Sequence, residues 1–97
     1  MYIGIAHLQL HLPENHSLKG KRRVVRSVCD RLRHRFRISV AETGGQDTWQ
    51  SAEIGLAAVS GDAATARSVI ESAVEYAESH LWDVQIIETD VDVLDLR

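Results

Sequence analysis

The residues of this chain with the clearest chemistry are cations gathered in one stretch, residues 17–37 (SLKGKRRVVRSVCDRLRHRFR). Nine of the chain's eleven Lys and Arg residues lie there beside a single acid, Asp30, so the local charge is +8 in a protein whose net charge is −3. Residues 38–97 carry twelve acids and two bases. This segregation predicts one surface that attracts polyanions, while the remaining surface repels them.

The same stretch has the period of an amphipathic helix that begins at Ser17. We expect the Ser17 hydroxyl to cap the helix by accepting a hydrogen bond from an orphan backbone N–H group. The predicted buried stripe recurs at helical spacing and consists of Leu18, Val25, Val28, Cys29, Leu32 and Phe36. Several cations fall in the first turns, where the helix dipole makes each exposed cation unfavourable by about 0.3–1 kcal/mol. The pattern therefore favours an anion bound near the helix start.

We expect that anion to be the phosphate groups of RNA, free or within a ribosomal assembly. The candidate contact residues are His16, Lys19, Lys21, Arg22, Arg23, Arg26 and Trp49. Trp49 lies in a polar connection, GGQDTWQS (44–51). Its ring either stacks on a base, or it covers the sheet edge or makes a subunit contact. We favour the second interpretation. Because only 5% of residues are aromatic, we expect contacts to the backbone and shape of RNA rather than base stacking.

Three alternatives for the basic helix remain open. Carboxylates of the same fold or assembly can neutralise it, and the candidates are Glu88, Asp90, Asp92 and Asp95. The helix can instead dock on an acidic protein surface, which would make the chain a homo-oligomeric interaction module. An enzyme acting on a small phosphorylated substrate would require a concave pocket beside His16 and the helix start.

Six predicted elements position these side chains. Residues 2–12 alternate, which predicts a strand with one face on a core, and Pro13 ends it. The other predicted elements are a helix at 17–37, strands at 37–43 and 52–60, a helix at 63–79 capped by Asp62, and a strand at 84–94. With right-handed crossovers, the order β-α-β-β-α-β favours an α+β ferredoxin-like fold, a four-stranded antiparallel sheet with both helices on one face.

The opposite face of that sheet is expected to be open. Its predicted residues are Ile3, Ile5, His7, Gln9, His11, Ala57 and Val59. With Ile3, Ile5 and Val59 exposed, the face would be more apolar than a solvated surface should be, so we expect it to pack against another subunit in a homodimer or against a partner.

The sequence predicts no catalytic constellation, no metal site and no cofactor. Acylphosphatases share this length and element order, but they bind phosphate in a Gly-rich, Arg-containing loop after the first strand, and the corresponding loop here is LPENHS. His7 and His11 share a strand face about 13 Å apart, too far to chelate one metal ion without other ligands. Cys29 is expected to be a core residue rather than a nucleophile.

Length and composition predict a single globular domain over residues 1–97, with 44% hydrophobic and 26% charged residues. A single cysteine cannot form an internal disulfide, which suits a reducing compartment. No apolar run approaches the roughly 20 residues that span a bilayer. We therefore expect a cytoplasmic protein without membrane contact.

Four segments together resemble the YlxP-like family of small bacterial proteins of uncharacterised function. They are the HSLKGKRR run (16–23), the VAE run (40–42), the QDTWQ run (46–50) and the AAVS run (57–60). The resemblance extends over nearly the whole chain and implies a ferredoxin-like fold. It also implies an association with translation, because relatives are often encoded among genes for translation and ribosome maturation, but it supplies no catalytic residues.

Overall fold

The computed structural model describes residues 1–13, 16–45, 48–81 and 83–97. Its elements are β1 (Tyr2–His11), α1 (Leu18–Phe36), β2 (Ser39–Gly44), β3 (Ser51–Ser60), α2 (Ala63–His80) and β4 (Gln85–Asp95). Every predicted element is present, with ends displaced by at most two residues. Parts of the predicted loops (Glu14, Asn15, Gln46 and Asp47) and Trp82 lie outside the described residues.

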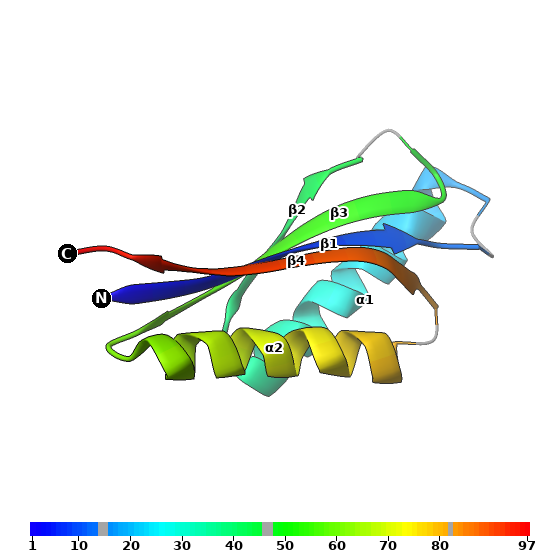
Figure 1. The fold of residues 1–97 in the computed structure, drawn as a ribbon. Coiled ribbons are helices and arrows are strands. Elements are labelled where there is room, and N and C mark those ends of the chain that lie inside the picture. The colour runs from blue at the N-terminus through cyan, green and yellow to red at the C-terminus, as the bar shows by residue number, and fades with distance from the viewer. Residues whose placement is uncertain (14–15, 46–47, 82) are drawn as a thin grey trace.

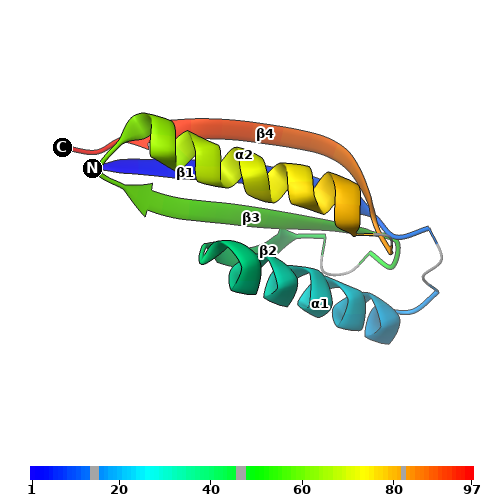
Figure 2. The same cartoon turned by 90° about the horizontal axis from the view of Figure 1, so that it is seen from below.

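The four strands form one sheet in the order β2-β3-β1-β4, and all neighbours are antiparallel. Both helices lie on one face of this sheet, as Figures 1 and 2 show. α2 packs on β1, β4 and β3, whereas α1 packs on the edge strand β2 and on α2. This arrangement confirms the predicted ferredoxin-like fold. In the described part of the chain, no helix combines the length and apolarity that a membrane crossing needs.

The core lies between the sheet and the helices. Alternate residues of the strands enter it, and α1 contributes one stripe, so the core follows the predicted periods of two and 3.6 residues. The largest apolar side chains that are fully buried are Leu8, Leu10, Leu12, Leu32, Ile54 and Ile70. Leu18 and Phe36, at the ends of the predicted α1 stripe, are only partly buried.

Hydrogen bonds fix both ends of α1. Ser17 is the N-cap, as predicted, and its Oγ accepts a 3.0 Å hydrogen bond from the backbone N–H of Gly20. Asp62 caps α2 in the same way. At the other end of α1, Arg37 adopts a left-handed conformation (φ 51°, ψ 48°), and its N–H donates to the Arg33 carbonyl at 3.0 Å. The prediction that Arg37 begins the second strand is therefore wrong, because this residue terminates the helix.

Candidate functional site

The solvent side of α1 carries an open hollow of about 590 Å³ between its side chains. Its lining consists of Lys19, Arg22, Arg23, Arg26 and Arg31, together with Ser27 and Asp30. At pH 7 these five cations and one carboxylate give a local charge of +4. Residues three and four positions apart are neighbours on a helix surface, which is why these side chains share one face, opposite the buried stripe. We call these five cations the basic face.

No cation of the basic face forms an ion pair or a hydrogen bond with any other described residue. The acids of β4 lie at the far edge of the sheet, three strands away from β2, against which α1 packs. Within the described residues, the only β4 acid in an ion pair is Asp95, which is 3.7 Å from Arg97. The predicted alternative in which these acids neutralise α1 within one chain is therefore wrong.

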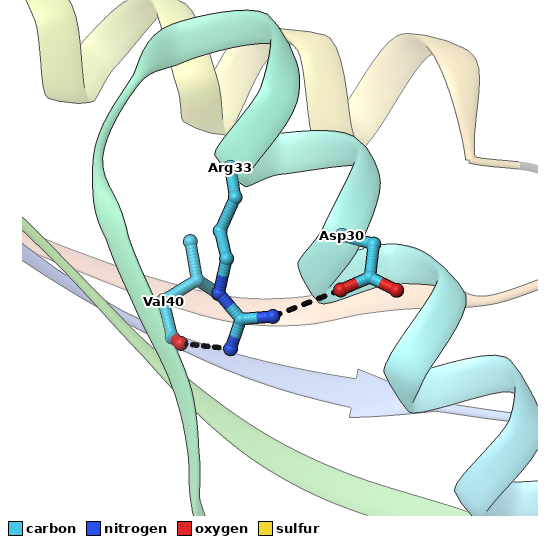
Figure 3. A network of polar contacts seen from close by, with 3 residues as sticks. All are labelled: Asp30, Arg33 and Val40. Carbon is cyan, nitrogen blue, oxygen red and sulfur yellow. Dashed lines mark hydrogen bonds and ion pairs between the residues drawn. The ribbon is translucent and has the colours of Figure 1, made fainter.

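The single carboxylate among the described residues of the hollow, Asp30, already has a partner outside the basic face. Arg33 Nη1 donates to Asp30 Oδ1 at 2.9 Å, and Nη2 donates to the carbonyl oxygen of Val40 in β2 at 2.5 Å (Figure 3). The Arg33 guanidinium thus joins α1 to the neighbouring strand. Its role is structural, and it draws Asp30 away from the cations of the hollow.

Lys21 does not belong to the basic face, and its predicted role as a phosphate contact is wrong. Its side chain is 2% exposed because it lies in the middle of the buried stripe, four residues before Val25. Nζ donates a hydrogen bond to the carbonyl oxygen of Gly45 and lies 3.6 Å from Glu42 Oε2. The ammonium is shielded from solvent and already neutralised within the fold.

The remaining cations of α1 lie near its C-terminal end. The Arg35 guanidinium carbon is 4.8 Å from the centre of the Tyr76 ring, in a cation–π contact with α2. Tyr76 in turn stacks on His80, with 4.7 Å between ring centroids. Arg35 therefore supports the contact between the two helices, and it does not line the hollow.

His16 and Trp49 lie outside the hollow. His16 is exposed and directly precedes the cap of α1. Trp49 is 54% exposed, so its ring is only partly covered by the protein. The connection that carries Trp49 is held beside the end of β1, because Leu12 N donates to the Gln50 carbonyl oxygen at 2.8 Å. The roles predicted for both residues stay predictions.

Arg31 belongs to the basic face but is absent from the residues that the sequence singled out. The signal that identifies it is helical periodicity, since Arg23, Ser27 and Arg31 form one row at four-residue spacing. The sequence-based selection favoured cations near the helix start, so it left Arg31 out. The basic face is longer than predicted and is centred on the middle of α1.

The other reactive groups are accounted for by the fold. Cys29 is 4% exposed in the core, and burial raises the pKa of its thiol, which favours the unreactive protonated form. Among residues 1–13, 16–45, 48–81 and 83–97, no three His, Cys, Asp or Glu side chains meet in an arrangement that could hold a metal ion.

Comparisons with known proteins agree with this architecture. The chain is 32% identical over 77 residues to "Uncharacterized protein YlxP" of Bacillus subtilis (strain 168), a match covering 79% of this chain and 84% of the relative. The de novo designed protein Foldit4 is similar over the full length of both chains, with a TM-score of 0.52 and 11% identity, which is a likeness of fold alone. Residues 3–91 match the family described as "Protein of unknown function (DUF503)", and the chain therefore belongs to this family of YlxP-like proteins.

Proposed function

We propose that the basic face of α1 binds the phosphate backbone of structured RNA, free or within a ribosomal assembly. The observation that carries this proposal is the set of five cations on one helix face without an internal counter-ion among the described residues. The protein as a whole has a charge of −3, so its general surface does not attract nucleic acid. Any such attraction must come from this face.

The chemistry and length of the face suit a polyphosphate. Four of its five cations are arginines, whose planar guanidinium groups bind phosphate oxygens through two parallel hydrogen bonds. From Lys19 to Arg31 the helix extends about 18 Å, enough to meet several successive phosphates. Among the residues that the structure describes, no aromatic side chain lines the hollow, so this lining offers no platform for a base. We therefore expect recognition of backbone and shape with little dependence on sequence.

A small phosphorylated substrate fits this site less well. The hollow is open and lies on one helix, whereas small-molecule sites are enclosed on several sides. Asp30, the only carboxylate among the described residues of its lining, is already held by Arg33 and is poorly placed to act as a general base. The face can hold phosphates, but it lacks the groups that would transform them.

Fluorescence anisotropy with a fluorescein-labelled RNA hairpin, measured across a KCl series, tests the proposal. For five phosphate contacts the slope of log K against log [salt] is about −3.5 to −4.5, so affinity falls roughly 130- to 500-fold between about 50 and 200 mM salt. The double variant Arg22→Ala/Arg26→Ala leaves three contacts, and the slope should become about −2.1 to −2.7, with a fall of roughly 20- to 40-fold.

The matched control is Arg67→Ala/Arg97→Ala, which removes the same charge away from the basic face. It should leave the slope unchanged. Equal losses in the two double variants, or a wild-type slope shallower than about −2, would overturn the proposal. Capture of an acidic protein from nuclease-treated lysate, without RNA binding, would instead support the alternative of docking on a protein surface.

A further inference from the structure

The face of the sheet opposite the helices is uncovered, and its apolar side chains gather at one end. Ile3 is the register partner of Val59 on β3 and of Leu94 on β4. The three residues are therefore level with one another, side by side across the strands on this face. Val59 is 68% exposed and Leu94 is 46% exposed. Met1 and Leu96 continue the patch at the end where both termini lie (Figure 1). Exposed aliphatic side chains that adjoin in this way mark an interaction surface.

The total exposed surface supports the same interpretation. The chain exposes 6099 Å², whereas a folded monomeric protein of 10.8 kDa is expected to expose about 5,500 Å². The chain is also elongated, with extents of 44 × 23 × 20 Å. One uncovered sheet face accounts for surface in excess of that of a compact monomer.

We propose that this face is the interface of a homodimer in which the two sheets pack face to face, with equivalent strands parallel and apolar end on apolar end. In this arrangement the two-fold axis lies between the two sheets, runs parallel to the strands, and passes over the gap between β1 and β3. Each β1 then lies over the partner's β3, and each β4 lies over the partner's β2.

The charges of the open face select this orientation. None of the four strands carries a Lys or an Arg, so an acidic group on this face has no Lys or Arg on the same face of a second copy to pair with. Most acids of this face lie on β4, where Asp90 and Asp92 are level with His7 and Ile5, and β2 is uncharged on this side. Glu53 of β3 is level with Gln9 and lies 3.4 Å from His7, and an axis along the strands places it over the partner's Gln9. An axis along the strands places each acidic edge over the partner's uncharged edge. An axis across the strands would bring carboxylates onto carboxylates, which repel one another.

Shape favours the same orientation. Above Gly55, which has no side chain, lies a hollow of about 380 Å³ that Ala41, Thr43 and Ala57 also line. Gly55 is level with His7 of β1, whose side chain is 44% exposed and stands 3.4 Å from Glu53. With the axis between β1 and β3, the partner's His7 projects toward this hollow. The imidazole of one copy thus faces Gly55 of the other copy, a position where the sheet has no side chain.

The size of the face is sufficient for a dimer of modest affinity. β1 has ten residues and the sheet has four strands. At about 3.3 Å per residue and 4.8 Å per strand, the face covers roughly 600 Å² on each copy, so a dimer buries about 1,200 Å². That area is at the lower limit of specific interfaces, which bury about 1,200–2,000 Å². We therefore expect association that depends on protein concentration.

Sedimentation equilibrium tests whether this face associates. The wild-type protein should approach twice its 10.8 kDa mass as concentration rises. Val59→Lys should weaken the dimer by more than about tenfold, because it places a charge in the apolar patch. Ser68→Lys, which adds the same charge on the exposed side of α2, should leave association unchanged. If circular dichroism shows that Val59→Lys does not fold, Leu94→Lys replaces it. A wild-type protein that stays monomeric, or a folded patch variant that associates normally, overturns the proposal.

A second pair of variants tests the orientation. Ala41 is level with Gly55 and hence with Asp90, so the proposed dimer places it opposite the partner's Asp90. Ala41→Lys should tighten the dimer and Ala41→Glu should loosen it. With the axis across the strands, Ala41 would meet β2 of the partner and both variants would loosen the dimer, which overturns the proposed packing. The RNA assay is independent, because α1 lies on the other face of the sheet (Figure 2).

Discussion

Replacing Lys21 by Met, Glu42 by Leu, and both together measures how the fold accommodates a charged pair in its interior. Lys21 is 2% exposed and Glu42 is 26% exposed, and their charged atoms are 3.6 Å apart. At an effective dielectric constant of about 20, two unit charges at this separation attract by about 4.6 kcal/mol. Desolvation of both groups offsets much of that attraction, so the net contribution of the intact pair is small.

The two single variants should differ because their residual charges differ in access to water. Lys21→Met leaves a carboxylate whose side chain is 26% exposed, although its Oε2 atom is buried and has no hydrogen-bond partner among the described residues, and we expect a loss of about 2–3 kcal/mol in the free energy of unfolding. Glu42→Leu leaves an ammonium group away from water with the Gly45 carbonyl as its hydrogen-bond acceptor, and we expect about 4–5 kcal/mol. The double variant leaves no buried charge and should lie within about 1 kcal/mol of the wild-type protein.

Urea unfolding at neutral pH, with linear extrapolation of the free energy, provides the measurement. The control is Asp30→Asn, which breaks an ion pair whose side chains are 46% and 53% exposed. That change should cost less than about 1 kcal/mol, because water screens the exposed pair. Additive single effects in the double variant would refute the electrostatic coupling. A larger loss for Lys21→Met than for Glu42→Leu would refute the argument from solvent access.

Three further changes test other parts of the fold. A Cβ on Gly4 would overlap the carbonyl oxygen of Ala66 in α2, so Gly4→Ala should lower the free energy of unfolding by about 1–3 kcal/mol, and unchanged thermal unfolding would contradict this packing. Hydrogen bonds from Thr65 lower the pKa of Asp62 below its unfolded value of 3.8, so the stability it contributes is present above that pH and lost as pH falls through the folded pKa. The wild-type Tm should therefore fall more than that of Asp62→Asn between roughly pH 5 and pH 3, and parallel curves would contradict the cap's role. Cys29, with its raised pKa and 4% exposure, should react with an aromatic disulfide at about pH 8 only after denaturation, and rapid reaction of the native protein would place the thiol elsewhere.

The fold was predictable because its local signals agree with one another. Ser17 and Asp62 each stand directly before an amphipathic pattern, and both cap helices in the structure. β1 and β3 alternate with a period of two, which assigned each of these strands a buried face. Element order then left few topologies to consider. Helix caps and hydrophobic periods depend on residues that are close together in the chain, so one sequence is enough to detect them.

Lys21 shows where the sequence-based prediction relied on the wrong signal. Helical periodicity places Lys21 on the buried side with Val25, Val28 and Leu32, whereas its residue type predicts exposure. Here the periodicity predicted the burial of Lys21 correctly, whereas the residue type did not. Glu42 likewise alternates in phase with the buried Val40, so both charged residues were on core faces by their own periods. Their meeting depends on how α1 packs against β2, which the sequence does not specify.

The same limit applies to the division of cations on α1. Arg33 and Arg35 resemble the cations of the basic face in sequence, yet Arg33 binds the carbonyl of Val40 in β2, and Arg35 stacks on Tyr76 of α2. These partners lie on other elements. Net charge alone therefore overstated the available positive surface, and the structure reduces it from nine cations in the stretch to five at the hollow.

Topology explains why the acids of β4 do not neutralise this surface within one chain. α1 packs on β2, at one edge of the sheet, whereas the acids of β4 lie at the other edge. Moving these charges together would require a different strand order. Cations such as Lys19 in the first turn of α1 therefore remain unfavourable toward the helix dipole, by about 0.3–1 kcal/mol each at an exposed site. The proposed binding of a polyanion would remove that cost, and packing through the open face would leave both copies of the basic face on the outside of the proposed dimer.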